Sequence, residues 1–385
     1  MPSARSLPAT GASSMPSPAD RVSGPNTAWL SSLSPWPDSF GLDGIKALLK
    51  ELKHPERAFR SVHVVGTNGK TTTTKRIEAL LMREGVRSGA TISPHVRGWA
   101  ERISVNGAGA DLERALARVR PAAERLKATQ FEVITAAAFA EFAAAGVELA
   151  AVEAGLGGRY DATNVLSSEV VVLTNVSLEH TRWLGSTREA IAREKLAVIA
   201  PGAKVVLGEA EWEGLAREAG AGSVAVVAHE ELPRKAVELV LGRAVENAAV
   251  ELQIPGRLEW RGAHELWDGA HNLAGVRWLV RNLPRRRWTL VCSILADKDV
   301  DAMLEALASL GSVLVATGSS NDRVLPAAAL AARAESLFER VEAIDDPGRA
   351  VARGRELATP DGHLLVTGSL YLLADLVSIE EAVWE

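Results

Sequence analysis

The sequence is almost free of cysteine, and it has neither a long apolar run nor an excess of positive charge. Cys292 is the single cysteine among 385 residues. No disulfide can therefore form within the chain, which is typical of a reducing compartment. No stretch reaches the roughly 18 apolar residues that a membrane span needs. With 43 Lys and Arg against 48 Asp and Glu, a broad nucleic-acid-binding surface is not expected. We therefore expect a soluble cytoplasmic protein, with no membrane or nucleic-acid partner.

The composition is that of a globular protein. Hydrophobic residues make up 47% of the chain, which is enough for a sizeable core, and the length suggests two domains. Residues 1–27 are rich in Ser, Pro, Ala and Gly and contain no apolar run long enough for a signal peptide. We expect these 27 residues to form a disordered tail. Cys292 lies in an apolar run, so we expect it to be a small buried hydrophobe rather than a nucleophile.

The most informative stretch runs from Val62 to Thr72. It predicts a short buried strand, a glycine-containing turn over Gly66–Gly69, and a helix that starts with Lys70, Thr71 and Thr72. Such a junction aims backbone N–H groups and the positive end of a helix dipole at one point, which suits a phosphate. Lys70 adds a positive charge, and a Thr hydroxyl after it can reach a metal ion. Because Val64 stands where the full phosphate-loop pattern has its first glycine, this is a shortened variant. A plain strand–turn–helix corner is the alternative interpretation.

Strands and helices alternate along the rest of the chain, which predicts a doubly wound α/β fold with a parallel sheet. The turn at Ile254–Gly256 marks a boundary between a domain over 28–254, which contains the phosphate-loop segment, and a smaller Rossmann-like α/β domain over 255–385. We expect Ser186–Glu189 to be a capping box that opens a helix to about Ala200. Further helices are expected at 42–52, 111–126, 131–145, from 272, and at 299–310 and 327–338. Further strands are expected at 88–92, 149–154, 169–174, 265–267, 289–293, 312–317 and 363–366.

Polar residues at strand ends are candidate ligands, because ligands bind beyond the carboxyl ends of strands in open α/β sheets. Glu153 ends an apolar strand, where a charge is costly unless it is paired or bound to a metal. Magnesium is the natural partner beside a triphosphate; a solvated strand end is the alternative. Ser93 and His180 also follow strands, but ordinary structural roles explain each of them when considered alone. On spacing alone, Lys195 is a lysine lying along an apolar helix face with its charge in water.

The second domain has one candidate segment, Asp268–Asn272, between a strand and a helix. Asp268 can accept a hydrogen bond from a sugar hydroxyl, while His271 and Asn272 open a helix whose N-terminus favours an anion. A plain helix cap explains the same residues equally well.

Taken together, these segments resemble a known family. Gly66–Thr72 resembles the phosphate loop of the Mur-ligase superfamily, and the other segments resemble its folate branch, the folylpolyglutamate synthases, which are often also dihydrofolate synthases. The matching segments are Ser93–His95, Glu101–Gly107, Phe131–Glu132, Glu153–Asn164, Leu178–Thr181, Leu184–Gly185, Arg193–Lys195, Pro255–Glu259, Asp268–Asn272, Asp297–Asp299 and Thr367–Ser369. The resemblance extends over roughly residues 30 to 380, and Glu153–Asn164 is its most specific segment.

The resemblance implies an ATP-dependent ligase that forms an amide bond to L-glutamate. A carboxylate is phosphorylated to an acyl phosphate, the glutamate amine attacks, and phosphate leaves. The acceptors implied are reduced folates, dihydropteroate or both. The resemblance also implies two Mg²⁺ ions and a carbamylated Lys195. We expect a monomer.

The resemblance also assigns candidate site residues. ATP is held by Gly66, Thr67, Asn68, Gly69, Lys70, Thr71, Thr72, Arg257 and Asp268. The metal ligands are Ser93, Glu153, His180 and the carbamylated Lys195. The pterin-side pocket is lined by Thr129, Gln130, Phe131, Glu132, Tyr160, Asp161 and Ala162. The residues closest to the chemistry are Lys70, His180, Lys195 and His271.

The chain departs from the family pattern at a few places. Thr71 and Thr72 stand where folate enzymes commonly have Gly and Ser, and Glu179 replaces an aspartate before His180. The segment 230–255 is shorter than the family's, and the family's nucleotide-binding asparagine has no clear match there, with Asn247 as the candidate.

Two other functions are alternatives. A peptidoglycan-precursor ligase carries a whole substrate domain before the phosphate loop, and only about 40 ordered residues are expected here before Gly66, which is too few for a domain. A nucleotide-binding protein without catalysis is disfavoured because Lys70, Glu153, His180 and Lys195 are all present.

Overall fold

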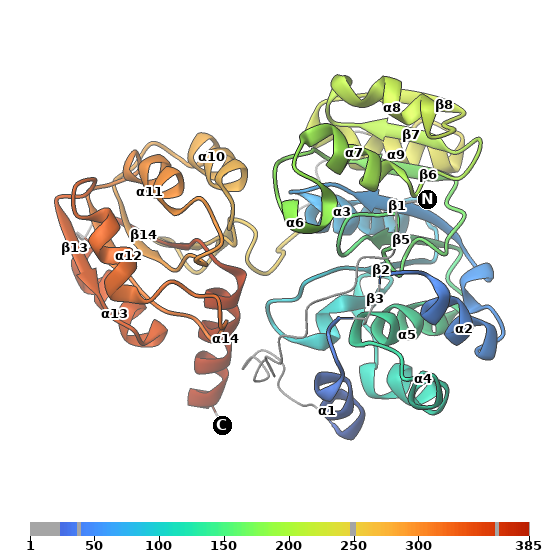
Figure 1. Ribbon diagram of the computed structural model, residues 1–385, viewed down its shortest axis with the longest axis horizontal. Coiled ribbons are helices and arrows are strands. Elements are labelled where there is room, and N and C mark those ends of the chain that lie inside the picture. Colours follow the sequence, from blue (N-terminus) through green and yellow to red (C-terminus); the bar gives the residue numbers. More distant parts are fainter. Residues whose placement is uncertain (1–23, 37–39, 247–251, 359–361, 385) are drawn as a thin grey trace. The chain divides into compact units, whose positions relative to one another are not determined.

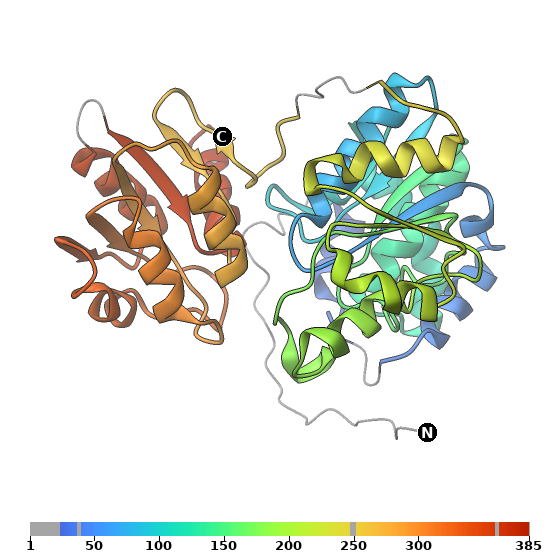
Figure 2. The same ribbon diagram turned by 90° about the horizontal axis from the view of Figure 1, so that it is seen from above.

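Two compact units make up the part of the chain that the computed structural model describes, residues 24–36, 40–246, 252–358 and 362–384 (Figure 1). The first unit holds residues 24–95 and 99–252, and the second holds 96–98 and 253–384. In each unit, helices cover both faces of a mostly parallel sheet, as Figure 2 shows from above. The predicted α/β class is therefore confirmed.

The first unit is built on an eight-stranded sheet in the order β4-β3-β2-β5-β1-β6-β7-β8. All neighbouring strands are parallel except at β3 and β4, which pair antiparallel at one edge. The central strands are buried along almost their whole length, because helices cover both faces. The strands are β1 (Arg60–Val65), β2 (Ser88–Thr91), β3 (Ile103–Val105), β4 (Ala108–Gly109), β5 (Leu149–Glu153), β6 (Val170–Leu173), β7 (Lys204–Leu207) and β8 (Ser223–Val226).

Helices pack on this sheet in two layers. Helices α3 and α9 share a core with Val62 and Val64 of β1, whereas α4 and α5 pack on one half of the opposite face and α7 and α8 on the other half. The helices of this unit are α1 (Pro25–Ser32), α2 (Asp43–Glu51), α3 (Lys70–Arg83), α4 (Leu112–Leu126), α5 (Gln130–Ala145), α6 (Thr181–Leu184), α7 (Arg188–Leu196), α8 (Glu213–Glu218) and α9 (Leu232–Leu241).

The second unit has a six-stranded sheet in the order β13-β12-β11-β14-β10-β9, in which only β9 runs antiparallel among the described strands. Helices α10, α11 and α12 cover one face and α13 and α14 the other, so the loops after β11 and β14 leave toward opposite faces. The elements are β9 (Glu259–Trp260), β10 (Glu265–Trp267), β11 (Trp288–Cys292), β12 (Val313–Ala316), β13 (Arg340–Ala343), β14 (His363–Thr367), α10 (Leu273–Asn282), α11 (Val300–Ala308), α12 (Ala327–Ala334), α13 (Pro347–Leu357) and α14 (Leu370–Trp384). Cys292 is buried, and burial raises the pKa of its thiol to about 12, as expected for a core residue.

The expected tail over 1–27 is wrong at its end, because helix α1 begins at Pro25. A proline suits the first turn of a helix, where its missing N–H is not needed. The Glu113 carboxylate accepts from the N–H groups of Asn26 and Thr27, at 3.0 and 2.8 Å, and Leu30 is fully buried. Residues 1–23 lie outside the described part of the chain, as does Asn247.

The capping box predicted at Ser186–Glu189 is also wrong, by one residue. Thr187 is the N-cap, and its hydroxyl accepts from the N–H of Ala190 at 3.1 Å. Glu189 therefore falls one position too early to close the box, and its carboxylate pairs with Arg193 instead. Helix α7 ends at Leu196 rather than near Ala200. Within the described ranges, no helix is long and apolar enough to cross a membrane.

Candidate active site

The predicted phosphate loop joins β1 to α3 in a conformation that needs its glycines. Gly66 has φ of +150°, and a Cβ there would lie 1.8 Å from the Thr174 hydroxyl oxygen. Gly69 has φ of +79° and caps α3, which begins at Lys70. The first N–H groups of α3 have no partner within the helix, and the Lys70 ammonium donates to the Thr67 carbonyl oxygen at 3.3 Å. The loop therefore has the donors and the charge that a polyphosphate requires.

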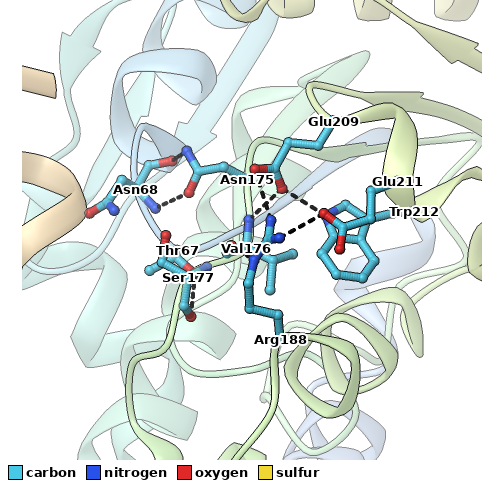
Figure 3. A network of polar contacts seen from close by, with 9 residues as sticks. All are labelled: Thr67, Asn68, Asn175, Val176, Ser177, Arg188, Glu209, Glu211 and Trp212. Atoms are coloured by element: carbon cyan, nitrogen blue, oxygen red, sulfur yellow. Dashed lines mark hydrogen bonds and ion pairs between the residues drawn. The ribbon is translucent and has the colours of Figure 1, made fainter. Parts of the chain in front are cut away.

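A neighbouring segment, Asn175–Ser177 after β6, holds the loop in place (Figure 3). The N–H of Thr67 donates to the Asn175 carbonyl oxygen at 2.9 Å. The Asn175 amide accepts from the N–H of Asn68 at 3.0 Å and donates to the Asn68 carbonyl oxygen at 3.1 Å. The Thr67 hydroxyl accepts from the N–H of Ser177 at 3.0 Å. These contacts fix the loop backbone, and the predicted ATP contacts of Thr67 and Asn68 stay predictions.

A pocket adjoins the loop and gathers residues from four chain segments. Its lining residues are Gly66, Thr67, Lys70, Gly155, Leu156, Gly157, Glu179, His180, Leu184 and Lys195. Three residues predicted to be closest to the chemistry, Lys70, His180 and Lys195, thus line one pocket in the first unit. His180 has φ of +51° and lies directly before α6.

Lys195 is not the surface lysine that its spacing alone suggested. Its side chain is 4% exposed, and its Nζ donates to the Gly66 carbonyl oxygen at 2.7 Å. Burial, with a smaller contribution from the Lys70 charge, lowers the pKa of Lys195 to about 7. Gly158 allows this close packing, since a Cβ there would lie 2.7 Å from the carbonyl oxygens of Glu194 and Lys195.

Glu153 is not a solvated strand end either. It is 3% exposed, and its carboxylate accepts from the Thr71 hydroxyl at 3.1 Å and from the N–H of Ser93 at 3.2 Å. The Ser93 hydroxyl is buried and has no hydrogen-bond partner among the described residues. A buried hydroxyl without a partner beside a carboxylate and a threonine hydroxyl makes a set of hard oxygen ligands, which fits Mg²⁺.

Among the described residues, no three or more His, Cys, Asp or Glu side chains lie close enough together to hold a metal ion. This observation does not test the predicted set, which relies on Ser93 and on a modified Lys195 beside Glu153 and His180.

Of the first group of residues predicted for the pterin side, three make structural hydrogen bonds and Phe131 lies against the pocket-lining loop. The Glu132 carboxylate accepts from the N–H and the hydroxyl of Thr129, both at 2.8 Å, and so caps α5. The Gln130 amide donates to the Leu30 carbonyl oxygen at 3.2 Å. The Phe131 ring lies against Gly155, where a Cβ would be 2.7 Å from its Cζ. Phe131 is therefore the member of this group that lies against the pocket-lining loop.

The second predicted pterin-side group lies in the loop after β5. Tyr160 is 51% exposed, whereas Ala162 packs in the hydrophobic core. Asp161 is buried and accepts from the N–H groups of Leu156 and Thr163, at 2.8 and 3.0 Å, and from the Thr163 hydroxyl. Burial raises the pKa of Asp161 despite these hydrogen bonds. Asp161 therefore shapes the loop that lines the pocket, and Tyr160 is the member with an available ring face.

In the second unit, Asp268 ties two loops together. Its two oxygens accept from the N–H groups of Leu258 and Ala270, both at 2.9 Å, and burial raises its pKa. Arg257 donates to the Gly256 carbonyl oxygen at 3.0 Å, and Nδ1 of His271 donates to the Gly269 carbonyl oxygen at 2.8 Å. His271 thus presents Nε2 as its basic nitrogen when the ring is neutral. Asn272 is the N-cap of α10, as the helix-cap interpretation expected.

Four polar residues in the described part of the second unit were not predicted as site residues, although Thr367 lies in one of the segments that carry the family resemblance. Buried side-chain atoms of Ser293, Ser319, Thr367 and Asp375 have no hydrogen-bond partner among the described residues. The first three lie at the ends of β11, β12 and β14 or just beyond, where the loops diverge and α/β sheets bind ligands. Orphaned buried polar atoms are uncommon and need an explanation. Ser293 and Ser319 lie in none of the segments that carry the resemblance, and an isolated serine gives no sequence signal of this kind.

Two further residues near the phosphate loop were missed. The His229 ring lies against Gly69, where a Cβ would be 2.7 Å from both Cε1 and Nε2, and burial lowers its pKa. Glu179 is 9% exposed, lines the pocket, and its charge acts to raise the pKa of Lys195. Its place before His180 was visible in the sequence, whereas the position of His229 depends on the fold.

Comparison with known proteins agrees with the family resemblance of the sequence motifs. The Mur ligase middle domain matches residues 64–207, and the Mur ligase glutamate ligase domain matches residues 256–370. The dihydrofolate synthase/folylpolyglutamate synthase of Mycobacterium tuberculosis is 32% identical over 79% of this chain and 80% of its own length. The Bacillus subtilis protein of the same name is 29% identical over 87% of this chain and 94% of its own length.

Solved structures of folylpolyglutamate synthases have a similar fold. The M. tuberculosis folylpolyglutamate synthase complexed with ADP and AMPPCP has a TM-score of 0.81 and 29% identity, covering 88% of this chain and 95% of that one. The bifunctional Yersinia pestis enzyme complexed with AMPPNP and a manganese ion also has a TM-score of 0.81, with 25% identity over 93% and 98% of the two chains. The chain therefore belongs to the dihydrofolate synthase/folylpolyglutamate synthase family of Mur-type ligases.

Proposed function

We propose that this protein is an ATP-dependent ligase that joins L-glutamate to the carboxylate of a reduced folate, of dihydropteroate, or of both, through an acyl phosphate. One observation carries the proposal: a single pocket combines the phosphate loop and Lys70 with His180 and the buried Lys195. The family relationship supports the acceptor class, since the relatives are named for these two activities.

The first chemical difficulty is repulsion, because a carboxylate must attack the γ-phosphate of a polyanion. The N–H groups at the start of α3 and the Lys70 ammonium bind the phosphates and offset their charge. Lys70 then exchanges its contact with the Thr67 carbonyl oxygen for phosphate oxygens. Positioning of the two reactants and stabilisation of the developing charge supply the remaining rate enhancement.

Ser93 and Glu153 would hold a Mg²⁺ ion beside the loop, with Thr71 hydrogen-bonded to Glu153. The ion would supply charge neutralisation at the phosphates. The buried Ser93 hydroxyl supports this assignment, because its orphaned oxygen gains a partner. His180 and a modified Lys195 would hold a second ion on the pocket side.

The chemistry of Lys195 supports its modification to a carbamate. A pKa of about 7 leaves a large fraction of the amine neutral at physiological pH. The ammonium first loses one proton. The neutral amine nitrogen then attacks carbon dioxide, a C–N bond forms as one C=O π bond breaks, and a second proton is released, so that a cation becomes an anion. An anion can approach a metal ion where an ammonium cannot.

The acceptor and the amino acid need different surroundings. Phe131 and the exposed ring of Tyr160 suit an aromatic acceptor. The orphaned polar groups of Ser293, Thr367 and Asp375 suit a small zwitterion such as glutamate. In the second unit, Arg257, Asp268 and His271 stay candidates for the nucleotide and for the acceptor end of the reaction.

The test is phosphate release by the purified protein with MgATP and L-glutamate, with dihydropteroate or tetrahydrofolate in separate reactions. Release with both acceptors identifies a bifunctional enzyme, and release with the reduced folate alone identifies a chain-extending one. Lys70→Met should abolish release, whereas Lys235→Met, which removes a lysine paired with Glu238 on α9, should not. Release with neither acceptor from folded protein that binds ATP would refute the folate assignment and point to another Mur-type substrate.

A further inference from the structure

A three-residue segment, Asn175–Ser177, lies between the phosphate loop and a group of charged side chains (Figure 3). On the loop side, Asn175 and Ser177 make the contacts to Asn68 and Thr67 described above. On the other side, Val176 is held through its backbone. Its N–H donates to Oε2 of Glu209 at 2.9 Å, and its carbonyl oxygen accepts from Nε of Arg188 at 3.0 Å.

The two side chains that hold Val176 also hold each other. An amino group of Arg188 lies 3.2 Å from Oε1 of Glu209. The Trp212 indole N–H donates to Oε2 of Glu209 at 2.7 Å, and the Arg188 guanidinium lies over the Trp212 ring, 5.0 Å from its centroid. The Glu209 carboxylate is therefore bonded to three donors from three chain segments, which fixes its position relative to Val176.

Arg188 links this group to the pocket by a second route. It is the first residue of α7, and Lys195 lies seven residues further along the same helix, on the same face. Lys195 reaches the Gly66 carbonyl oxygen directly, while Arg188 reaches Thr67 through Val176 and Ser177. The helix is thus tied to the phosphate loop at both ends.

We propose that Glu209 and Arg188 are positioning residues for the nucleotide: by holding Val176, they set the geometry of the phosphate loop and of Lys195 without touching ATP. Neither side chain lines the pocket. The proposal rests on the proposed function, since it concerns how the loop presents its donors to the ATP phosphates. A misplacement of catalytic groups by about 1 Å can lower a rate by roughly 100-fold.

A purely structural role predicts a different result. The side chains of Glu209 and Arg188 are 31% and 41% exposed, and ion pairs with this much exposure contribute little to stability. Loss of the ion pair should therefore change KM for ATP and the Kd of MgADP far more than it changes the melting temperature.

The chain contains a matched control for this experiment. Glu211 pairs with the other amino group of Arg188 at 2.7 Å and is 52% exposed. Both carboxylates thus neutralise the same guanidinium, but Glu209 alone of the two is bonded to the Val176 N–H. Comparing Glu209→Ala with Glu211→Ala separates the contact with the segment from the loss of a charge beside Arg188.

The milder variant Glu209→Gln tests the contact itself. A glutamine oxygen can still accept from Val176 and Trp212, whereas its amide faces Arg188 without a charge. Glu209→Gln should therefore recover most of the function that Glu209→Ala loses, and it keeps the proposal testable if the alanine variant folds poorly.

The measurements are kcat and KM for ATP, the Kd of MgADP by calorimetry, and the melting temperature. We expect Glu209→Ala to raise KM for ATP and the Kd of MgADP by roughly tenfold or more, with KM for the acceptor unchanged. Glu211→Ala should stay within about twofold of wild type, and the two alanine variants should melt within a few degrees of each other. Equal nucleotide affinities for the two alanine variants, or a Glu209→Gln variant no better than Glu209→Ala, would overturn the proposal. A wild-type protein that neither binds nor consumes ATP would instead refute the proposed function.

Discussion

Replacing Lys195 with methionine should stabilise the protein while it abolishes activity. The Lys195 ammonium is buried, with its Nζ 2.7 Å from the Gly66 carbonyl oxygen, and burial lowers its pKa from 10.5 to about 7. A methionine fills a similar volume without a charge. The position therefore exchanges stability for function, as functional sites often do.

The magnitude follows from the pKa difference. A difference of about 3.5, at about 1.36 kcal/mol for each pH unit, amounts to about 5 kcal/mol. The lost hydrogen bond to Gly66 and its unsatisfied carbonyl oxygen subtract about 1–3 kcal/mol. The Lys195→Met variant should therefore be more stable than wild type by roughly 3 kcal/mol at pH 7.

The stability advantage of Lys195→Met should depend on pH. Between pH 7 and 10.5 the unfolded chain keeps its proton on Lys195 while the folded chain has lost it. Because the unfolded state then binds more protons, the unfolding free energy of wild type rises with pH across this window. The advantage of Lys195→Met is thus greatest at or below pH 7 and should shrink by about 2 kcal/mol between pH 7 and pH 9.

Urea unfolding at the two pH values, followed by tryptophan fluorescence, measures this difference. The buffers must be free of carbon dioxide so that the amine stays unmodified. Lys204→Met is the control, because the Lys204 ammonium also donates to a backbone carbonyl, that of Leu239 at 2.8 Å, from a half-buried position. The Lys204→Met variant should show no gain in the free energy of unfolding. A Lys195→Met variant less stable than wild type at pH 7, or an advantage equal at both pH values, would refute the reasoning.

Three further predictions concern single residues. Gly158→Ala places a Cβ 2.7 Å from the Lys195 carbonyl oxygen, so α7 must shift; we expect a loss of about 1–3 kcal/mol in thermal unfolding together with a lower kcat. Ser93→Ala removes an orphaned hydroxyl beside Glu153; the Mg²⁺ concentration for half-maximal activity should rise by roughly tenfold while the melting temperature stays constant. Asn272→Ala removes the N-cap of α10 and should cost about 1 kcal/mol in urea unfolding, with no change in KM for ATP if its role is structural.

The phosphate loop could be predicted from the sequence because its residues lie close together in the chain. The strand, the two glycines, and Lys70 followed by a threonine all lie within eleven residues, and each is required by local geometry or by the charge of a phosphate. The buried central strands β1, β5 and β6 were predicted for a similar reason, because a strand covered on both faces is apolar throughout.

Edge strands were missed because they lack that signal. Strands β8 and β13 have a half-exposed burial pattern, and β4 has two exposed residues. Their pairing depends on the neighbouring strand rather than on their own side chains. The start of helix α1 was missed because the Ser- and Pro-rich composition indicates disorder, whereas the helix is anchored by hydrogen bonds from Asn26 and Thr27 to Glu113, which lies 87 and 86 residues away in the chain.

The sequence by itself determined the family, the α/β class and the identity of the loop that faces a phosphate, because these depend on residue types in fixed local order. The tertiary structure decided the environments on which the chemistry depends. Burial places Lys195 beside Gly66 and lowers its pKa, and it turns Glu153 from a strand end into a hydrogen-bonded carboxylate beside Ser93. Desolvation and hydrogen bonding between distant segments produce these effects, and no local pattern records which distant segments come together.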